Sequence, residues 1–137
     1  MKIYFAGSIR GGRTDQNTYT QIIELLKNYG TVLTVHVGNK ALTALEEEKL
    51  TNEFIFDRDM KWLKQADVVI AEVTTPSLGV GYEIATAEKL NKKILCLIKK
   101  NDIKKLSAMI YGNKRLTVKT YTSIKEVERI LKSYWTI

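Results

Sequence analysis

The segment from Val68 to Glu83, VVIAEVTTPSLGVGYE, decides the fold of this chain. It begins with an apolar, β-branched run that is typical of a strand buried on both faces of a parallel sheet. The run breaks at residues 74–76, and a helix is predicted to follow behind Ser77 and Gly79. Backbone N–H groups at a helix start attract anions, and glycines let a ligand come close to the main chain. The segment therefore predicts a phosphate site with a carboxylate, Glu83, beside it.

Strand-like and helix-like segments alternate on both sides of this segment. The hydrophobic periodicity predicts strands at residues 2–6, 31–35, 67–73, 93–98 and 116–121, and helices at residues 14–29, 48–65, 79–91, 103–111 and 123–134. Such alternation is typical of an α/β fold, because right-handed crossovers place helices on both faces of a parallel sheet. We expect a single domain over residues 1–137, with a doubly wound, five-stranded parallel sheet of the flavodoxin or Rossmann type.

Two local patterns add detail to this outline. Ser123 and Glu126 match a capping box at the start of the last helix. Residues 37–49 are expected to be the least structured part of the chain. Their acids are expected to form a solvated first turn rather than a metal site, and these acids are Glu46, Glu47 and Glu48.

The composition narrows the range of partners. The 137 residues are 45% hydrophobic and carry a net charge of +7, with a pI near 9.4. The lysines are scattered without regular aromatic interleaving, which favours a solvated surface, or a field that steers small phosphorylated ligands, over binding of a nucleic-acid polymer. There is neither a signal-peptide pattern nor an apolar run as long as a membrane span, which predicts a cytoplasmic protein. Cys96 falls in an apolar run and is expected to be a buried structural thiol.

The carboxyl ends of parallel strands form one rim, and ligands bind outside that rim. The predicted rim collects residues 7–12 (GSIRGG) after the first strand, His36 after the second, and residues 74–79 after the third. Gly, Ser and Arg bind phosphate through main-chain N–H, hydroxyl and guanidinium groups. We therefore expect phosphate-binding loops at this edge.

Known nucleotide and metal motifs do not match. Residues 7–12 lack the Gly-Lys-Ser/Thr ending of a P-loop, which argues against a triphosphate site. Residues 79–84 (GVGYEI) begin like a dinucleotide loop, but Ile84 stands where the third glycine is needed. A single histidine, His36, cannot anchor a transition-metal site alone. The sequence thus argues against a dinucleotide cofactor and favours a metal-independent reaction.

Two acids, Asp59 and Glu83, border the apolar stripes of their predicted helices. Each can be explained as a partly buried acid satisfied by a cap or a lysine. Their placement near one rim also suggests a carboxylate pair at an oxocarbenium-like centre, with one nucleophile and one acid. Glu83, near a helix N-terminus, is expected to remain ionised, whereas Asp59, in a drier setting, is suited to hold or lend a proton.

Longer motifs resemble a known family. The segments YFAGSIRGGR (4–13), LTVHV (33–37), DMKWL (59–63), ADVV (66–69), AEVTTPSLGVGYE (71–83) and LSAMI (106–110) together resemble the 2′-deoxynucleoside 5′-phosphate N-hydrolases of the nucleoside 2-deoxyribosyltransferase superfamily. The resemblance spans nearly the whole chain in order. It implies a cofactor-free homodimer that hydrolyses the N-glycosidic bond of deoxynucleoside monophosphates to free base and 2-deoxyribose 5-phosphate.

The resemblance also implies roles for individual residues. Glu83 is implied as the nucleophile, Asp59 as the acid or base near the leaving base, and Tyr4 as the group that positions the carboxylate and the sugar. The residues implied to surround the nucleotide are Gly7, Ser8, Ile9, Arg10, Gly11, His36, Ser77 and Gly79, and Ser107 is implied to reach the phosphate held by the neighbouring subunit. Plain structural roles stay open beside these: a core tyrosine, a turn arginine, a strand-end histidine and helix-capping serines.

Three other functions stay open at this point. The first is a deoxyribosyltransferase, which uses the same intermediate but passes the sugar to a second base. The second is a ribonucleotide N-hydrolase of the cytidylate type. The third is a nonenzymatic nucleotide-binding module, in which Glu83 is dispensable.

Overall fold

A computed structural model describes residues 1–9 and 15–136, apart from the side chains of Lys40 and Glu47. Five parallel strands form one sheet in the order β2-β1-β3-β4-β5, the order of flavodoxin-like doubly wound proteins. The strands are β1 (Lys2–Ala6), β2 (Thr31–Val32), β3 (Val68–Glu72), β4 (Lys93–Lys99) and β5 (Thr117–Tyr121). The predicted fold class is therefore confirmed.

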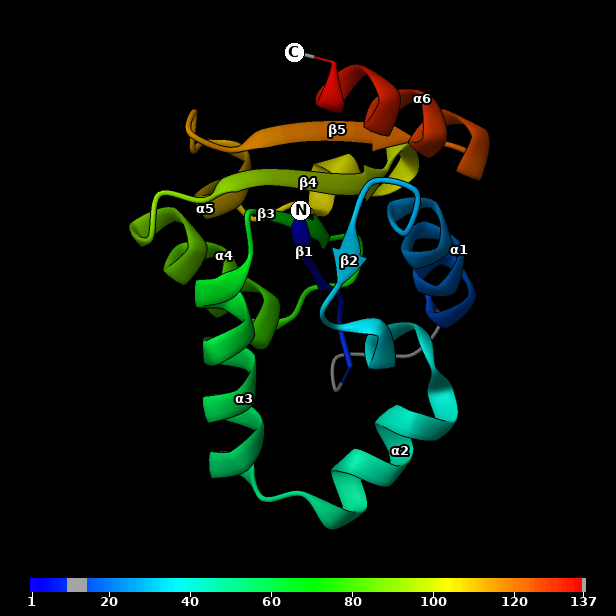
Figure 1. Ribbon diagram of the computed structural model, residues 1–137. Helices are drawn as coiled ribbons and strands as arrows, with labels where there is room; N and C mark the ends of the chain where they lie inside the picture. The colour runs from blue at the N-terminus through cyan, green and yellow to red at the C-terminus, as the bar shows by residue number, and fades with distance from the viewer. Residues whose placement is uncertain (10–14, 137) are drawn as a thin grey trace.

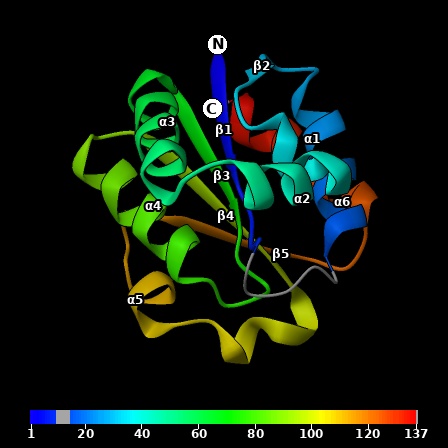
Figure 2. The ribbon, with the colours of Figure 1, turned by 90° about the horizontal axis from the view of Figure 1, so that it is seen from below.

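Helices cover both faces of the sheet (Figure 2). On one face lie α1 (Gln16–Leu26) and α6 (Ile124–Trp135), and on the other lie α3 (Asn52–Gln65) and α4 (Leu78–Lys89). Two apolar clusters fill the layers: Phe5, Ile22 and Leu131 belong to the first, and Val69, Ile84 belong to the second. Within the described ranges, residues 1–9 and 15–136, no helix is both long and apolar enough to cross a membrane.

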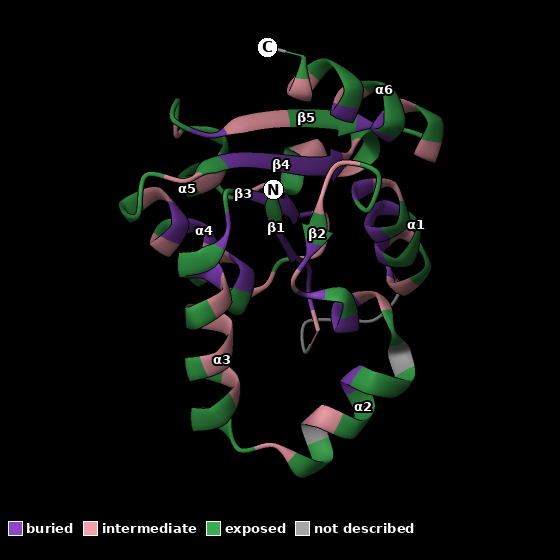
Figure 3. Ribbon diagram, viewed as in Figure 1, coloured by how far each residue is buried: buried purple, intermediate pink, exposed green. Residues whose placement is uncertain are grey.

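The centre of the sheet is the driest part of the molecule (Figure 3). All five residues of β3 are buried, as are the inner residues of β4. Cys96 of β4 is fully buried, and burial raises the pKa of its thiol to about 12. This confirms the prediction of a structural thiol.

The second strand is shorter than the predicted range 31–35. β2 covers only Thr31–Val32, and a short 3-10 helix, η1 (Val35–Gly38), follows. The physical reason is Thr34, whose hydroxyl accepts a hydrogen bond from the Phe5 N–H at 2.9 Å and donates one to the Phe5 carbonyl at 2.7 Å. This side chain replaces the main-chain ladder and lets the backbone turn away from the sheet.

The predicted helix at residues 48–65 is wrong as a single element. A separate helix, α2 (Lys40–Lys49), occupies most of the region expected to be least structured, and α3 begins at Asn52. Thr51 separates them because it is extended and caps α3, with its Oγ1 accepting from the Phe54 N–H at 3.1 Å. Figure 1 shows α2 and the first half of α3 extending together beyond the edge of the sheet.

The predicted helix at residues 103–111 also divides. It becomes a 3-10 helix, η2 (Lys100–Lys105), and a single turn, α5 (Ala108–Tyr111), which is capped by Ser107. The capping prediction for α6 is confirmed at its boundary, where Ser123 Oγ accepts from the Glu126 N–H at 3.3 Å. The Glu126 carboxylate reaches back one residue further than a standard capping box, to the N–H of Thr122.

Candidate active site

The loop between β3 and α4 is held by buried acids. Glu72, which is fully buried at the end of β3, accepts hydrogen bonds from the N–H and hydroxyl of Thr74 at 2.8 and 2.7 Å and from the hydroxyl of Tyr121. One residue further on, Thr75 donates to Asp15, which also pairs with Lys99 at 2.8 Å. These anchors fix the direction in which the loop leaves the sheet and enters α4.

A cavity of about 600 Å³ opens beside the start of α4. Four parts of the chain meet there: the end of β1, α2, α3, and the β3–α4 loop with the first turns of α4. Its lining residues are Gly7, Ile9, Thr43, Glu46, Ile55, Arg58, Asp59, Pro76, Ser77, Leu78, Gly79, Val80 and Glu83. The structure thus brings six of the sequence-predicted site residues to one cavity, from segments up to 76 positions apart.

Glu83 lies in the second turn of α4, and its Oε2 accepts a hydrogen bond from the hydroxyl of Tyr4 on β1. Burial raises the pKa of Glu83 to about 7, and Asp59 adds to the rise, while the Tyr4 hydrogen bond opposes it. Burial therefore acts against the expectation that the helix start keeps Glu83 ionised, because desolvation disfavours the charged form of the carboxyl.

Gly79 keeps the space in front of this carboxyl open. A Cβ at this position would lie 3.8 Å from Ser77 Oγ and 4.0 Å from Glu83 Oε1. Ser77 caps α4, with its Oγ accepting from the Val80 N–H at 3.2 Å. The cap serine and the carboxyl thus face the same small space, which is next to the N–H groups of the first turn of α4.

Asp59 borders the cavity from α3 and is held by its neighbour. Arg58 Nε donates to Asp59 Oδ1 at 3.0 Å, and Arg58 Nη1 donates to Glu46 Oε1 of α2 at 2.7 Å. Burial raises the pKa of Asp59, Glu46 acts in the same direction, and Arg58 and His36 act against it. The sequence hypothesis of a drier acid at Asp59 agrees with this direction.

His36 and Ser8 lie behind the cavity rather than in its lining. His36 is buried in η1, where its Nε2 is 3.3 Å from Arg58 Nη2, and burial lowers its pKa. Ser8 is buried, its N–H donates to the Tyr19 hydroxyl at 3.0 Å, and its own Oγ has no hydrogen-bond partner within the described part of the chain. Arg10 and Gly11, which are also predicted to surround the nucleotide, lie outside the described residues.

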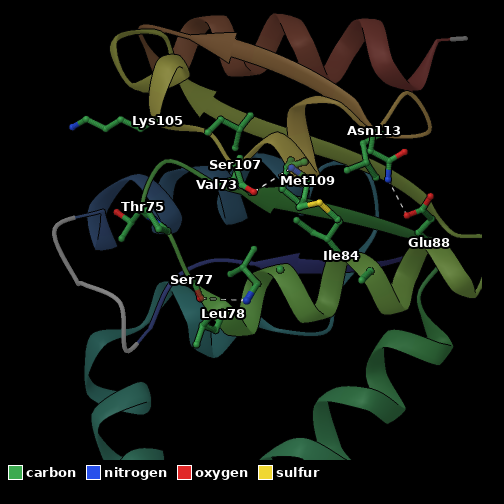
Figure 4. A pocket seen from close by; sticks show the side chains of 17 residues that line it. Val73, Thr75, Ser77, Leu78, Ile84, Glu88, Lys105, Ser107, Met109 and Asn113 are labelled. Carbon is green, nitrogen blue, oxygen red and sulfur yellow. Dashed lines mark hydrogen bonds between the residues drawn. The ribbon is translucent and has the colours of Figure 1, made fainter.

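Ser107 lines a different cavity, of about 670 Å³ (Figure 4). In this view Ser107 and Met109 face Leu78 and Ile84 across the space. The two cavities share the walls formed by residues 76–78 and Val80. Ser107 is therefore adjacent to the cavity of Glu83 but not in it within one chain.

The sequence reasoning missed Arg58 and misplaced Glu46. The acids of residues 46–48 were expected to form a solvated turn, yet Glu46 points to the cavity and pairs with Arg58. The sequence signal that could have indicated Arg58 is its position directly before Asp59 in the same predicted helix. For residues 1–9 and 15–136, no group of three or more His, Cys, Asp or Glu side chains is arranged to hold a metal ion.

Fold and cavity together define a doubly wound α/β protein with two carboxyls beside the start of a helix. A model of the nucleoside 2-deoxyribosyltransferase family matches residues 3–118. The chain therefore belongs to the nucleoside 2-deoxyribosyltransferase family, and the resemblance found in the sequence is confirmed.

Two relatives with about half of their residues identical to this chain are named 5-hydroxymethyl-dUMP N-hydrolase. The chain is 49% identical to a 5-hydroxymethyl-dUMP N-hydrolase of Esox lucius over 140 residues, covering 98% of this chain and 96% of that protein. It is 50% identical to the Mus musculus protein of the same name over 137 residues, covering 97% of this chain and 79% of that protein. Among solved structures, a CMP N-glycosidase of Clostridium botulinum, BcmB, matches with a TM-score of 0.69 at 18% identity, over 98% of this chain and 99% of that one. This structural likeness shows the shared fold.

Proposed function

We propose that this protein hydrolyses the N-glycosidic bond of 2′-deoxynucleoside 5′-monophosphates, releasing the free base and 2-deoxyribose 5-phosphate. The observation that carries the proposal is the convergence of Glu83, Asp59 and the start of α4 on one cavity. The names of the relatives from Esox lucius and Mus musculus support the same bond and the same class of substrate.

In the first chemical step, Glu83 Oε1 attacks the anomeric carbon of the sugar. Oε1 is the oxygen beside the open space at Gly79, whereas Oε2 is held by the Tyr4 hydroxyl. As the new C–O bond forms, the C–N bond breaks, and its electron pair leaves with the base, which takes a proton from Asp59. A deoxyribosyl centre lacks the 2-hydroxyl that destabilises developing positive charge, so a nearby carboxylate and a protonated leaving group suit it.

In the second step, water replaces Glu83 at the anomeric carbon. Asp59, now ionised, accepts a proton from the water as the oxygen attacks, and the C–O bond to Glu83 breaks. Glu83 is released as a carboxylate, and the sugar leaves as 2-deoxyribose 5-phosphate. Tyr4 assists because its hydroxyl donates a hydrogen bond that favours the ionised form of Glu83. This bond opposes the effect of burial, which raises the pKa of Glu83.

The 5′-phosphate is assigned to the start of α4. Ser77 Oγ accepts from a main-chain N–H and still has its own proton to donate. The N–H groups at the helix start and the helix dipole add further attraction for an anion. Contacts of this kind, distant from the bond that breaks, orient the sugar over Glu83 and select monophosphates over nucleosides.

The test is to incubate the protein with deoxy- and ribonucleoside monophosphates and the corresponding nucleosides, and to measure released base. Release from deoxynucleoside monophosphates alone supports the proposal. Release from nucleosides at the same rate would refute the phosphate site, and release only from ribonucleotides would instead establish a ribonucleotide N-hydrolase. Chelators are expected to leave the rate unchanged, and cofactor independence and a cytoplasmic location stay predictions.

A deoxyribosyltransferase is the second candidate, and the description of the matching family favours it. The same glycosyl-Glu83 intermediate forms in both reactions, and only the second acceptor differs. Adding an excess of a second base and looking for a new deoxynucleotide separates the two. A product that carries the added base would establish transfer in place of hydrolysis.

We also place Ser107 in the active site of a second copy of the chain. Leu78 and Met109, beside the Ser107 cavity, are 97% and 81% exposed, which leaves an apolar face for another subunit to cover. In a symmetric dimer this face brings each Ser107 next to the partner's α4 start. A mixed refolding experiment tests the arrangement.

In that experiment, Glu83→Gln chains and Ser107→Ala chains are unfolded and refolded together in equal amounts. If Ser107 serves the partner, each heterodimer has one doubly defective and one intact site, so roughly a quarter of wild-type sites return. If Ser107 serves its own chain, every site keeps one defect. With Ser107→Ala strongly impaired alone at subsaturating substrate, activity no higher than the mean of the separate variants would overturn the shared site.

A further inference from the structure

Arg58, at the wall of the cavity, contacts several neighbouring side chains. Its guanidinium bonds to Asp59 at 3.0 Å and to Glu46 at 2.7 Å, and it lies 3.3 Å from His36 Nε2. Its Cζ is also 4.7 Å from the centre of the Trp62 ring, in the geometry of a cation–π contact. These partners come from η1, α2 and α3, so the guanidinium is clamped from three elements.

We propose that Arg58 is a positioning residue for Asp59: its Nε–H holds the Asp59 carboxyl at the cavity wall, while Glu46 and Trp62 hold Arg58 itself. This inference rests on the proposed function and adds a residue to it. The planar guanidinium suits the role because its N–H groups have fixed directions, so one nitrogen can orient Asp59 while another is tied to α2. Asp59 then faces the leaving base in one orientation rather than several.

The ion pair between Arg58 and Glu46 joins α3 to α2, and both side chains also act on Asp59 through their charges. Within the described lining of the cavity, Arg58 supplies the positive charge, and Glu46, Asp59 and Glu83 supply the acids. His36 faces the same group from η1, and its lowered pKa leaves it neutral, so its Nε2 can accept from Arg58. Tyr4, behind Glu83, is a further titratable group near Asp59 among the described residues.

Arg58 and Glu46 therefore act on Asp59 in opposite directions. The positive guanidinium favours the ionised carboxyl, whereas the negative Glu46 disfavours it. Arg58→Gln should raise the pKa of Asp59, and Glu46→Gln should lower it. These opposite shifts follow from the charges alone, so a fall in kcat with little change in KM is the result that separates a positioning residue from a structural link between α2 and α3.

The experiment measures Asp59 directly and then in catalysis. Carboxyl ¹³C chemical shifts of labelled aspartate are followed against pH without substrate, with the Asp59 signal assigned by its loss in Asp59→Asn. The variants are Arg58→Gln, Arg58→Lys and Glu46→Gln, and Arg115→Gln is the matched control because its side chain is 78% exposed and contacts Glu88 instead. Base release is then measured over the same pH range.

We expect the Asp59 titration to move up in Arg58→Gln, up by less in Arg58→Lys, which keeps the charge but loses the Nε–H bond, down in Glu46→Gln, and to stay in place in the control. Arg58→Gln should lower kcat by on the order of 100-fold with little change in KM, because misorientation acts on the chemical step. Arg58→Lys should recover only part of kcat, since lysine keeps the positive charge but lacks the fixed N–H directions of the guanidinium.

An unmoved Asp59 titration in both Arg58→Gln and Glu46→Gln, or movement of both in the same direction, would overturn the inference. If Arg58→Gln does not fold, an Asp59 titration that fails to move down in Glu46→Gln overturns the inference by itself. Failure of the proposed function has a different signature, since wild-type protein would then release no base while the titrations could still move as expected.

Discussion

Glu83→Gln should make the protein more stable at alkaline pH while removing its activity. Burial raises the pKa of Glu83 from 4.5 to about 7, so the folded protein resists ionisation of this group. Because the folded-state pKa lies above the unfolded one, the cost is absent below the unfolded value, grows as pH rises, and is complete above the folded value. At about 1.4 kcal/mol per pH unit, the full cost is about 3 kcal/mol.

Glutamine has a similar shape, can still accept from Tyr4, and does not ionise. The variant should therefore gain about 3 kcal/mol in free energy of unfolding at about pH 8 and almost nothing at about pH 4. Urea denaturation at the two pH values measures this, with Glu128→Gln as the control because that side chain is 49% exposed. An equal effect of Glu83→Gln at both pH values, or none at about pH 8, would refute the reasoning that burial raises this pKa.

Three further substitutions test the other contacts of the site. Tyr4→Phe removes the hydrogen bond that favours ionised Glu83, so the acidic limb of the pH–rate profile should move to higher pH; an unmoved limb would contradict this role. Ser77→Ala should mainly raise KM for monophosphates, and an unchanged KM would indicate only a helix cap. Tyr121→Phe leaves the buried Glu72 with one donor fewer and should cost about 1–3 kcal/mol in urea denaturation, whereas a loss near zero would show that Thr74 satisfies the carboxylate alone.

Much of the fold followed from local patterns. The β-branched run of β3, its break at Pro76 and the restart of the chain as α4 predicted the strand, loop and helix that form one wall of the cavity. The alternation of periods two and 3.6 predicted five parallel strands because each element must bury one face. Errors arose where a side chain competed with the backbone, as Thr34 does at β2 and Thr51 does between α2 and α3.

The candidate residues divide in the same way. The sequence alone pointed to Glu83, Asp59 and Ser77. An acid beside an apolar stripe and a serine before a glycine-rich helix are local patterns that can be recognised without the structure. The pairing of Arg58 with Glu46 was not visible, since it depends on how α2 docks against α3 after the break at Thr51.

What the sequence by itself determined is the order of the elements and the chemical types placed at their ends, because propensity, capping and periodicity act over a few residues. Only the tertiary structure decided the protonation of those groups. The pKa of Glu83 depends on burial and on Tyr4, which is 79 positions away in the chain, and that of Asp59 depends on burial, Arg58 and the approach of Glu46. Desolvation depends on burial, and Coulomb interactions depend on distance in space. At this site both are set only when the sheet and α2 have packed around the two acids.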